Sequence, residues 1–160
     1  SPSRGLGDVY KRQEYIKISV LDFTENPGPR YIRQDRIGDS TSGEAFYIEK
    51  LNREFAKAFE EKKMLVLELD GVSGYPSSFL DEAIGELVFD FTLDVVSKLL
   101  DFDTVMYKRR VRQVKEETYL QWEQRRINKN IVMHSPGVDA DIYYIDDDGN
   151  LKIKHIYGNS

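Results

Sequence analysis

The run Met64-Leu-Val-Leu-Glu-Leu69 constrains the fold of this chain more than any other stretch. It is almost continuously apolar, and polar pairs bound it, Lys62-Lys63 before it and Asp70-Gly71 after it. Such a run is typical of a strand covered on both faces, as in α/β sheets. Apolar residues recur at helical spacing on either side of it, at Ile48, Leu51, Phe55 and Phe59 and again at Leu80, Ala83, Ile84, Leu87, Val88 and Phe91.

The remaining segments predict further elements of both kinds. Residues 15–23 alternate apolar and polar residues and predict a strand, while residues 30–37 are ambiguous, a short edge strand being one interpretation. Thr41, with Glu44 three residues later, fits the capping box of a helix that runs to about residue 61, and another helix begins at Ser77 or Ser78. Further along, the patterns predict helical turns over 93–100, a strand over 102–107, a third helix over 111–122 and a hairpin over 141–156. This order predicts an α/β layer fold with a C-terminal β-hairpin extension.

Residues 1–13 differ in character from everything that follows them. The codons for Asp8 to Gln13 can be written as the end sequence carried by transposase sequencing adapters, and Ser3 to Gly7 fit the adapter bases before it. We therefore interpret 1–13 as an adapter-derived artefact and exclude it from the fold. The expected division is a domain over 14–128 with a mixed sheet and helices, followed by a loop and hairpin extension over 129–160.

Composition narrows the function classes. The net charge of −5 becomes more negative without residues 1–13, so general nucleic-acid binding is not expected. Cysteine is absent, which excludes disulfides and thiolate sites, and no apolar run approaches the ~20 residues that span a bilayer. We expect a cytoplasmic protein without membrane contact, cofactor or metal. A serine hydrolase lacks a positioned base, because neither His134 nor His155 sits in a pattern that brings it to a serine.

The stretch from Leu67 to Glu82 is the most informative for function. A buried strand ends there, a loop follows, and Ser77 and Ser78 stand where the next helix begins. As caps of free backbone N–H groups they would contribute ~1 kcal/mol. A phosphate on either serine would instead meet those N–H groups and the helix dipole, and would add up to about −2 charge. Both interpretations stay open from the residues alone.

Three blocks in the chain resemble the bacterial STAS-like domain family of unknown function, over roughly residues 16–103. They are Asn26-Pro27-Gly28-Pro29-Arg30-Tyr31, then Ser42-Gly43-Glu44-x-Phe46, then Leu69 to Ala83. The resemblance implies kinship to the STAS fold of anti-sigma-factor antagonists. In those proteins a serine at the start of the second main helix is phosphorylated by a serine kinase of the GHKL ATPase kind, which breaks the complex with that kinase.

Carried onto this sequence, the resemblance implies Ser77 as the phosphorylation candidate and Ser78 as its rival. The flanks depart from the family pattern Asp-Ser-Ser-Gly or Asp-Ser-Thr-Gly, because Pro76 replaces the aspartate and Phe79 replaces the glycine. The implied role is that of a non-enzymatic regulatory domain that binds a partner protein.

An alternative function is a small-molecule or nucleotide sensor that binds an anion. Arg30 and the helix starts at 41–44 and 77–81 are expected at one edge of the sheet, where two helix N-termini and a guanidinium would attract an anion. Glu44, Asp81 and Glu82 oppose this site or complete the caps. The interaction or anion-binding candidates are Arg30, Ser42, Gly43, Asp70, Tyr75, Phe79, Asp81 and Glu82. The basic flank of the third helix (Lys108, Arg109, Arg110, Arg112 and Lys115) is a further surface for an acidic partner.

Overall fold

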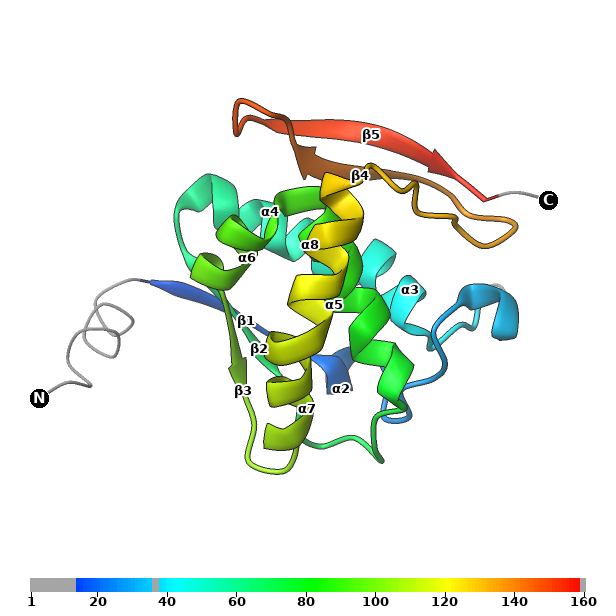
Figure 1. The fold of residues 1–160 in the computed structure, drawn as a ribbon. Coiled ribbons are helices and arrows are strands. Elements are labelled where there is room, and N and C mark those ends of the chain that lie inside the picture. The colour runs from blue at the N-terminus through cyan, green and yellow to red at the C-terminus, as the bar shows by residue number, and fades with distance from the viewer. Residues whose placement is uncertain (1–13, 36–37, 159–160) are drawn as a thin grey trace, which may run out of the picture.

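The computed structural model describes residues 14–35 and 38–158, so the adapter interpretation of residues 1–13 falls outside the described residues. Three parallel strands form one sheet in the order β1-β2-β3 (Figure 1), with β1 at Tyr15–Ser19, β2 at Met64–Glu68 and β3 at Leu100–Asp103. An antiparallel hairpin of β4 (Asp139–Ile145) and β5 (Leu151–Tyr157) stands apart from it. The predicted α/β class and the hairpin extension are confirmed, and the parallel and antiparallel pairings belong to separate sheets.

Helices make up most of the rest of the fold. Residues 43–61 and 108–127 each form a continuous helix with a π-helical turn in the middle. The helical elements are α2 (Val20–Phe23), η1 (Ile32–Gln34), α3 (Gly43–Phe46), η2 (Tyr47–Leu51), α4 (Asn52–Glu61), α5 (Ser77–Phe91), α6 (Leu93–Leu99), α7 (Lys108–Gln113), η3 (Val114–Thr118) and α8 (Tyr119–Ile127).

The two faces of the parallel sheet differ. Leu65 and Leu67 of β2 are fully buried, and α4 and α6 pack against the strands. On alternate residues, Lys17 Nζ lies 2.7 Å from Asp103 Oδ2 and 3.3 Å from Glu68 Oε2, with all three side chains substantially exposed. The sequence predicts cover on both faces of β2, and the middle of the strand confirms it, since Val66 on the second face is only 3 % exposed; the ion-pair cluster lies where this face ends, at Glu68.

Three predicted segments end earlier or fold differently, each because a side chain takes up backbone N–H groups. The first strand stops at Ser19, whose hydroxyl accepts a hydrogen bond from Asp22 N and caps α2. The ambiguous segment forms the 3-10 turn η1, where Glu44 accepts from Ile32 N at 3.0 Å. The strand expected over 102–107 is β3, which ends at Asp103 because Asp70 accepts hydrogen bonds from Val105 N and Met106 N just beyond it.

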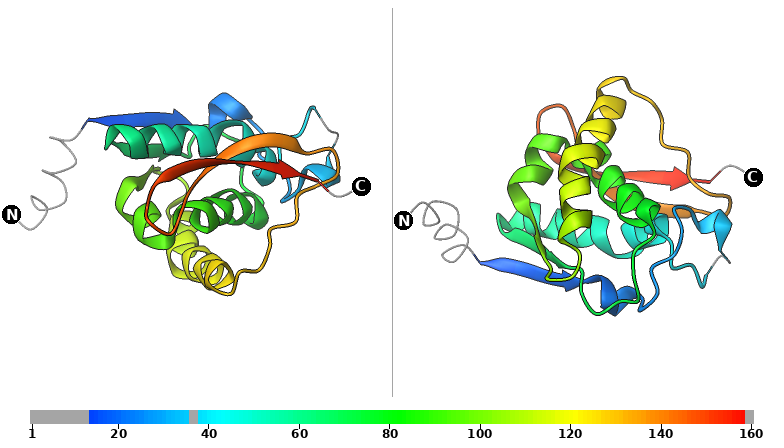
Figure 2. Two further views of the ribbon diagram at one scale, coloured as in Figure 1. Left: turned by 90° about the horizontal axis from the view of Figure 1, so that it is seen from above. Right: turned by 60° about the horizontal axis from the view of Figure 1, so that its bottom comes forward.

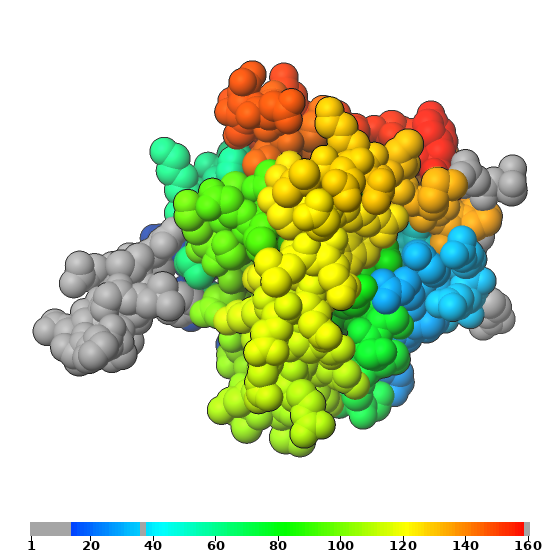
Figure 3. Space-filling view, viewed as in Figure 1, coloured from blue at the N-terminus to red at the C-terminus, as the bar shows by residue number. Residues whose placement is uncertain are grey.

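Helix α5 is the centre of the packing. It contacts α3, α6, the helix 108–127 and β4, and Figure 2 shows it enclosed among them. A Cβ on Gly85 would lie 2.1 Å from the Trp122 indole, so only glycine allows this close approach. The helix 108–127 forms a ridge over one side of α5, with the hairpin across its upper end (Figure 3).

The C-terminal hairpin shares the core of the domain. Ile142 and Ile156 are buried in the same apolar cluster as α5. Asn52 of α4 fixes the strand β4, since its Nδ2 donates to Tyr143 O and its Oδ1 accepts from Tyr143 N, both at 2.9 Å. The hairpin is therefore docked by specific polar contacts as well as by apolar burial.

Candidate functional site

The loops at the carboxyl ends of the three parallel strands lie at one edge of the sheet, which is where ligands and partners of parallel α/β sheets commonly bind. Asp70, directly after β2, organises this edge. Its carboxylate accepts hydrogen bonds from Thr104 Oγ1, Val105 N (2.7 Å) and Met106 N (3.2 Å). The bond from Thr104, with those from the two backbone amides, lowers the pKa of Asp70. Asp70 thus shapes the approach to the edge by fixing the loop after β3.

Tyr75 holds the same edge together from inside. It is 5 % exposed, its hydroxyl donates to Leu69 O at 2.6 Å, and its ring meets Tyr107 edge-to-face at 4.7 Å between centroids. Burial raises the pKa of this phenol. Arg110 Nη2 donates to Tyr75 O at 2.8 Å. The prediction that Tyr75 is a surface contact residue is wrong, because its side chain is part of the core beneath the loop.

Ser77 and Ser78 begin α5, as the sequence predicts, but they do not cap it. The N-cap is Pro76, which makes no side-chain capping bond, and Phe79 N bonds to Pro76 O. Ser77 is exposed and Ser78 is half-buried, and neither hydroxyl has a hydrogen bond within the described part of the chain. The capping interpretation is therefore wrong for both serines, and their hydroxyls are unengaged.

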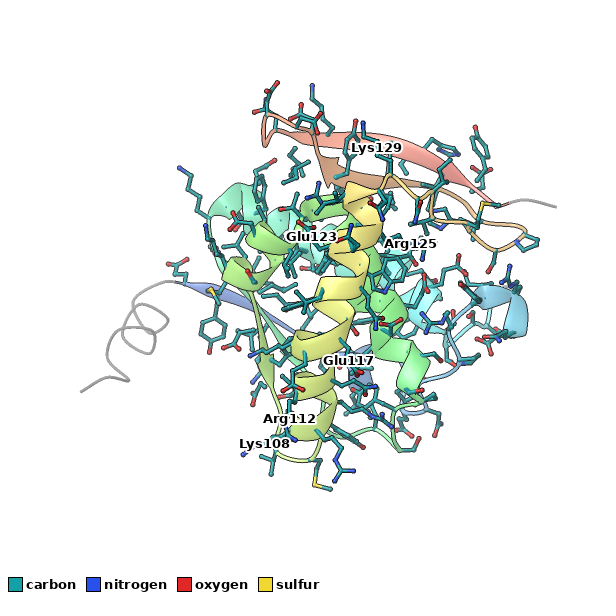
Figure 4. The ribbon with its side chains drawn as sticks, viewed as in Figure 1. Lys108, Arg112, Glu117, Glu123, Arg125 and Lys129 are labelled. Atoms are coloured by element: carbon teal, nitrogen blue, oxygen red, sulfur yellow. The ribbon has the colours of Figure 1, made fainter. Side chains whose placement is uncertain are left out.

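Exposed apolar side chains lie on these loops, and the sequence interpretation missed them. Val105 is 77 % and Met106 74 % exposed in the loop after β3, and Leu21 is 37 % exposed after β1. Ordered loops that display such side chains are a common feature of protein contact surfaces. The signal in the sequence is Val105-Met106 between a strand and a basic run, but the predicted strand over 102–107 includes both residues. Figure 4 places Lys108 and Arg112 of that run at the same end of the helix 108–127.

Arg30 meets two of the acidic candidates. Its Nη1 lies 2.7 Å from Asp81 Oδ2 and 3.1 Å from Glu82 Oε1, and Asp81 also accepts from Thr118 Oγ1 at 2.8 Å. Burial opposes the charge of Arg30, but its hydrogen bonds to Asp81 and then Glu82 outweigh that effect and raise its pKa. The sequence correctly brings these three residues together. An anion would have to displace two carboxylates from the guanidinium.

The N–H groups at the start of helix 43–61 are also hydrogen-bonded within the domain. Gly43 N bonds to Pro29 O at 2.9 Å and Glu44 N to Arg30 O at 3.0 Å, while Ser42, the actual N-cap, accepts from Ala45 N. The predicted Thr41–Glu44 capping box is thus wrong. With this helix start occupied, the anion site expected between two helix N-termini is not formed.

Three further interaction candidates are interior residues. Ser42 and Phe79 are fully buried, and a Cβ on Gly43 would lie 2.3 Å from Phe79 O. Gly43 therefore permits the close crossing of α3 and α5, and Phe79 stacks on Phe46 at 5.7 Å. The prediction that Ser42, Gly43 and Phe79 contact a ligand or partner at the surface is wrong, because these residues lie in the interior where α3 and α5 pack together.

A row of buried carboxylates along α5 escaped the sequence interpretation. Glu82, Glu86 and Asp90 lie four residues apart and are 2 %, 1 % and 6 % exposed. Burial raises the pKa of all three, and for Glu86 the nearby carboxylate of Glu82 raises it further. Asp90 is paired, since it accepts from Lys154 Nζ at 2.6 Å and from the Tyr47 hydroxyl.

The C-terminal segment covers the middle of this row. The His134 side chain is 9 % exposed, with Nδ1 lying 3.5 Å from Glu44 Oε2 and 3.7 Å from Glu86 Oε1. Glu44 also accepts from Ser135 N at 2.9 Å and from the Ser135 hydroxyl. Burial alone would raise the pKa of Glu44, but the contacts with His134, Ser135 and Ile32 N lower it. Glu86 Oε2 and His134 Nδ1 are buried without a hydrogen bond.

The described residues contain neither a cluster of metal-ligating side chains nor a helix that could span a membrane. Across 14–35 and 38–158, no group of three histidine or acidic side chains has an arrangement that could hold a metal ion. None of the helices in these ranges has both the length and the apolar character needed to cross a bilayer.

Comparison with known families adds one finding. A family model described as a STAS-like domain of unknown function matches residues 47–105, from the middle of helix 43–61 through β2 and α5 to the loop after β3. The resemblance is confirmed over this span, which contains the third sequence block with Asp70, Ser77 and Ser78, whereas the blocks at 26–31 and 42–46 lie outside it. No curated protein and no solved structure matches the chain.

Proposed function

We propose that this chain, whose residues 47–105 match the STAS-like domains of unknown function, is a non-enzymatic regulatory domain that binds a partner protein at the carboxyl edge of its sheet. The observation that carries the proposal is the unengaged pair Ser77 and Ser78 at an uncapped helix start. Beside it, ordered loops expose Val105 and Met106. Apolar side chains on a rigid rim suit a protein partner better than a small ligand.

Phosphorylation of Ser77 or Ser78 would switch this contact off. A phosphate adds up to about −2 charge and accepts hydrogen bonds strongly. At the start of α5 it meets free backbone N–H groups, and Arg110 bonds to the carbonyl of Tyr75, two residues before Ser77. The modified serine would thus be stabilised on the domain while presenting negative charge and bound water to the partner. Ser77 is the first candidate because it is the more exposed.

The proposed partner is an ATPase-type serine kinase of the GHKL kind, and the proposed location is the cytoplasm. The family resemblance supports this partner class, and the acidic net charge of −5 argues against nucleic acid as the partner. A nucleotide or small-molecule sensor is the competing function. It would require an anion to compete with Asp81 and Glu82 for Arg30.

The test is a pull-down from a lysate of the source organism with residues 14–160 as bait. Wild type is expected to retain an ATPase-type kinase, identified by mass spectrometry, and the double variant Ser77→Asp/Ser78→Asp is expected to lose it. Ser97→Asp, an exposed serine on α6, is the control for added charge alone and should bind as wild type does. Equal recovery by wild type and the double variant would contradict the switch. A rise in the Tm of the wild-type domain on adding ATP, with no partner protein present, would favour the sensor.

A further inference from the structure

One edge of the C-terminal hairpin has an unpaired backbone. Asn52 engages the N–H and C=O of Tyr143, so these groups point away from β5. Tyr143 lies opposite Ile153 in the antiparallel register, and the two therefore form a non-hydrogen-bonded pair. It follows that the N–H and C=O of Ile153, and by the two-residue repeat those of His155, point out of the hairpin on the other side. Among the described residues these groups have no partner.

A groove of about 900 Å³ lies along this part of the hairpin. Its walls are the hairpin, with both strands and the turn, the end of α5 and the segment 126–134, and Figure 2 (left) shows β5 on the side of the hairpin that faces that segment. An isolated parallel bridge between His134 and Gly158 closes one end. Beyond this bridge the segment 126–134 leaves β5, so pairing along the edge starts at Gly158 and is not continued by this chain.

The groove offers apolar contact and one lysine without an ion-pair partner, and Asp146 and Asp147 of the hairpin turn line it as well. Ile131 is 76 % and Tyr157 69 % exposed. Arg126 is held by Glu123 and Lys154 by Asp90. Lys129 has no ion-pair partner in the described ranges, and Figure 4 places it at the end of α8, beside the hairpin. A ligand of the groove therefore benefits from apolar groups and from a negative charge near Lys129.

We propose that the free edge of β5 and this groove bind an extended peptide segment of a partner protein, added to the hairpin as a third strand, with apolar side chains in the groove and an acidic side chain at Lys129. Strand addition explains the combination found here, because main-chain hydrogen bonds supply affinity and alternate side chains supply specificity. This surface is separate from the edge that carries Ser77, so the proposal does not depend on the proposed function.

The experiment pans a library of random octapeptides against the immobilised full chain, and measures the enriched peptides as synthetic fluorescent probes. Acidic, alternately apolar peptides are expected. Ile153→Pro removes the outward N–H without breaking a β4–β5 hydrogen bond, and should weaken binding about tenfold. Lys129→Glu should weaken it about as much, by reversing the charge. Ile153→Thr keeps the donor and is the matched control, expected to bind as wild type does.

A second series uses only the wild-type chain, and so avoids any loss of folding in Ile153→Pro. Each peptide is N-methylated at one position at a time, and affinity is expected to fall at alternate positions, where the amide faces β5. Enriched peptides that bind equally to Ile153→Pro, or that tolerate methylation everywhere, would overturn the proposal. A dimer in analytical ultracentrifugation that Ile153→Pro dissociates would also overturn it, because the edge would then belong to a second copy of this chain.

Discussion

Replacing Glu86 with Gln is expected to stabilise the fold at neutral and alkaline pH and to change little near pH 4. Glu86 is 1 % exposed, and burial raises its pKa well above the ordinary 4.5, with Glu82, Asp90 and Glu44 adding to that rise. The folded state therefore holds a proton that the unfolded state releases. The contribution of protonated Glu86 to the free energy of unfolding is fully present below pH 4.5. It falls as the pH rises from there and is lost once the pH has passed the pKa of Glu86 in the folded protein. Gln has no such proton and keeps the shape of the side chain.

The size of the effect follows from linkage. Between the unfolded and folded pKa values, wild type loses about 1.4 kcal/mol for each pH unit through this group. Glu82, Asp90, Glu44 and His134 face Glu86 in both proteins, so the comparison of wild type with Glu86→Gln isolates the change made at residue 86. That difference should grow by up to about 1.4 kcal/mol for each pH unit above 4.5, until the pH reaches the raised pKa of Glu86 in the folded protein.

The assay is urea unfolding at each pH from 4 to 8, followed through the emission of Trp122, the single tryptophan of the chain. Glu60→Gln, an exposed carboxyl on α4, is the matched control and should give a small difference that does not vary with pH. A Glu86→Gln difference that is equally flat across the range would refute the reasoning, since Glu86 would then ionise in the folded protein as it does in the unfolded chain.

Two further substitutions test the packing. In an exposed helix, Gly→Ala stabilises by about 1 kcal/mol. Gly85→Ala should instead destabilise the protein by about 1–3 kcal/mol, because the added Cβ would lie 2.1 Å from the Trp122 indole. A higher urea midpoint for Gly85→Ala would contradict this contact. Asn52→Ala leaves the N–H and C=O of Tyr143 unpaired, at about 1–3 kcal/mol for each group. Amide exchange at Tyr143 should then accelerate and the hairpin should be cleaved first by protease, whereas unchanged exchange would exclude Asn52 as its anchor.

The elements whose signal is local could be predicted from the sequence. The almost continuous apolar run Met64–Leu69 predicts β2, and the apolar residues at helical spacing predict α5. In both cases the pattern of buried residues lies within the segment itself. The start of α5 at Ser77 was predicted for the wrong reason, since the expected serine cap is absent and Pro76 precedes the helix. A helix start can be read from where a pattern begins, even when its hydrogen bonds cannot.

The sites were less predictable, because the blocks that carry the family resemblance proved to be mainly structural. The carbonyls of Pro29 and Arg30 close the start of helix 43–61, and Gly43 allows the crossing with α5. A recurring motif marks a position where few residues fit, and close packing restricts residues as strictly as binding does. Only the structure separates packing from binding in these blocks. Among their residues, Ser77 and Ser78 have hydroxyls that make no hydrogen bond within the described part of the chain.

The carboxylate row on α5 shows why a residue's surroundings cannot be read from its own segment. The spacing of Glu82, Glu86 and Asp90 was visible, but acidic residues at such intervals ordinarily face water. They are buried because residues far along the chain cover them, with His134 over Glu86 and Lys154 on Asp90. A purely apolar face on α5 would accept many apolar segments. We expect this face to favour a segment that brings a cation to Asp90, as Lys154 does, so that the polar row on α5 sets the register in which the C-terminal hairpin docks.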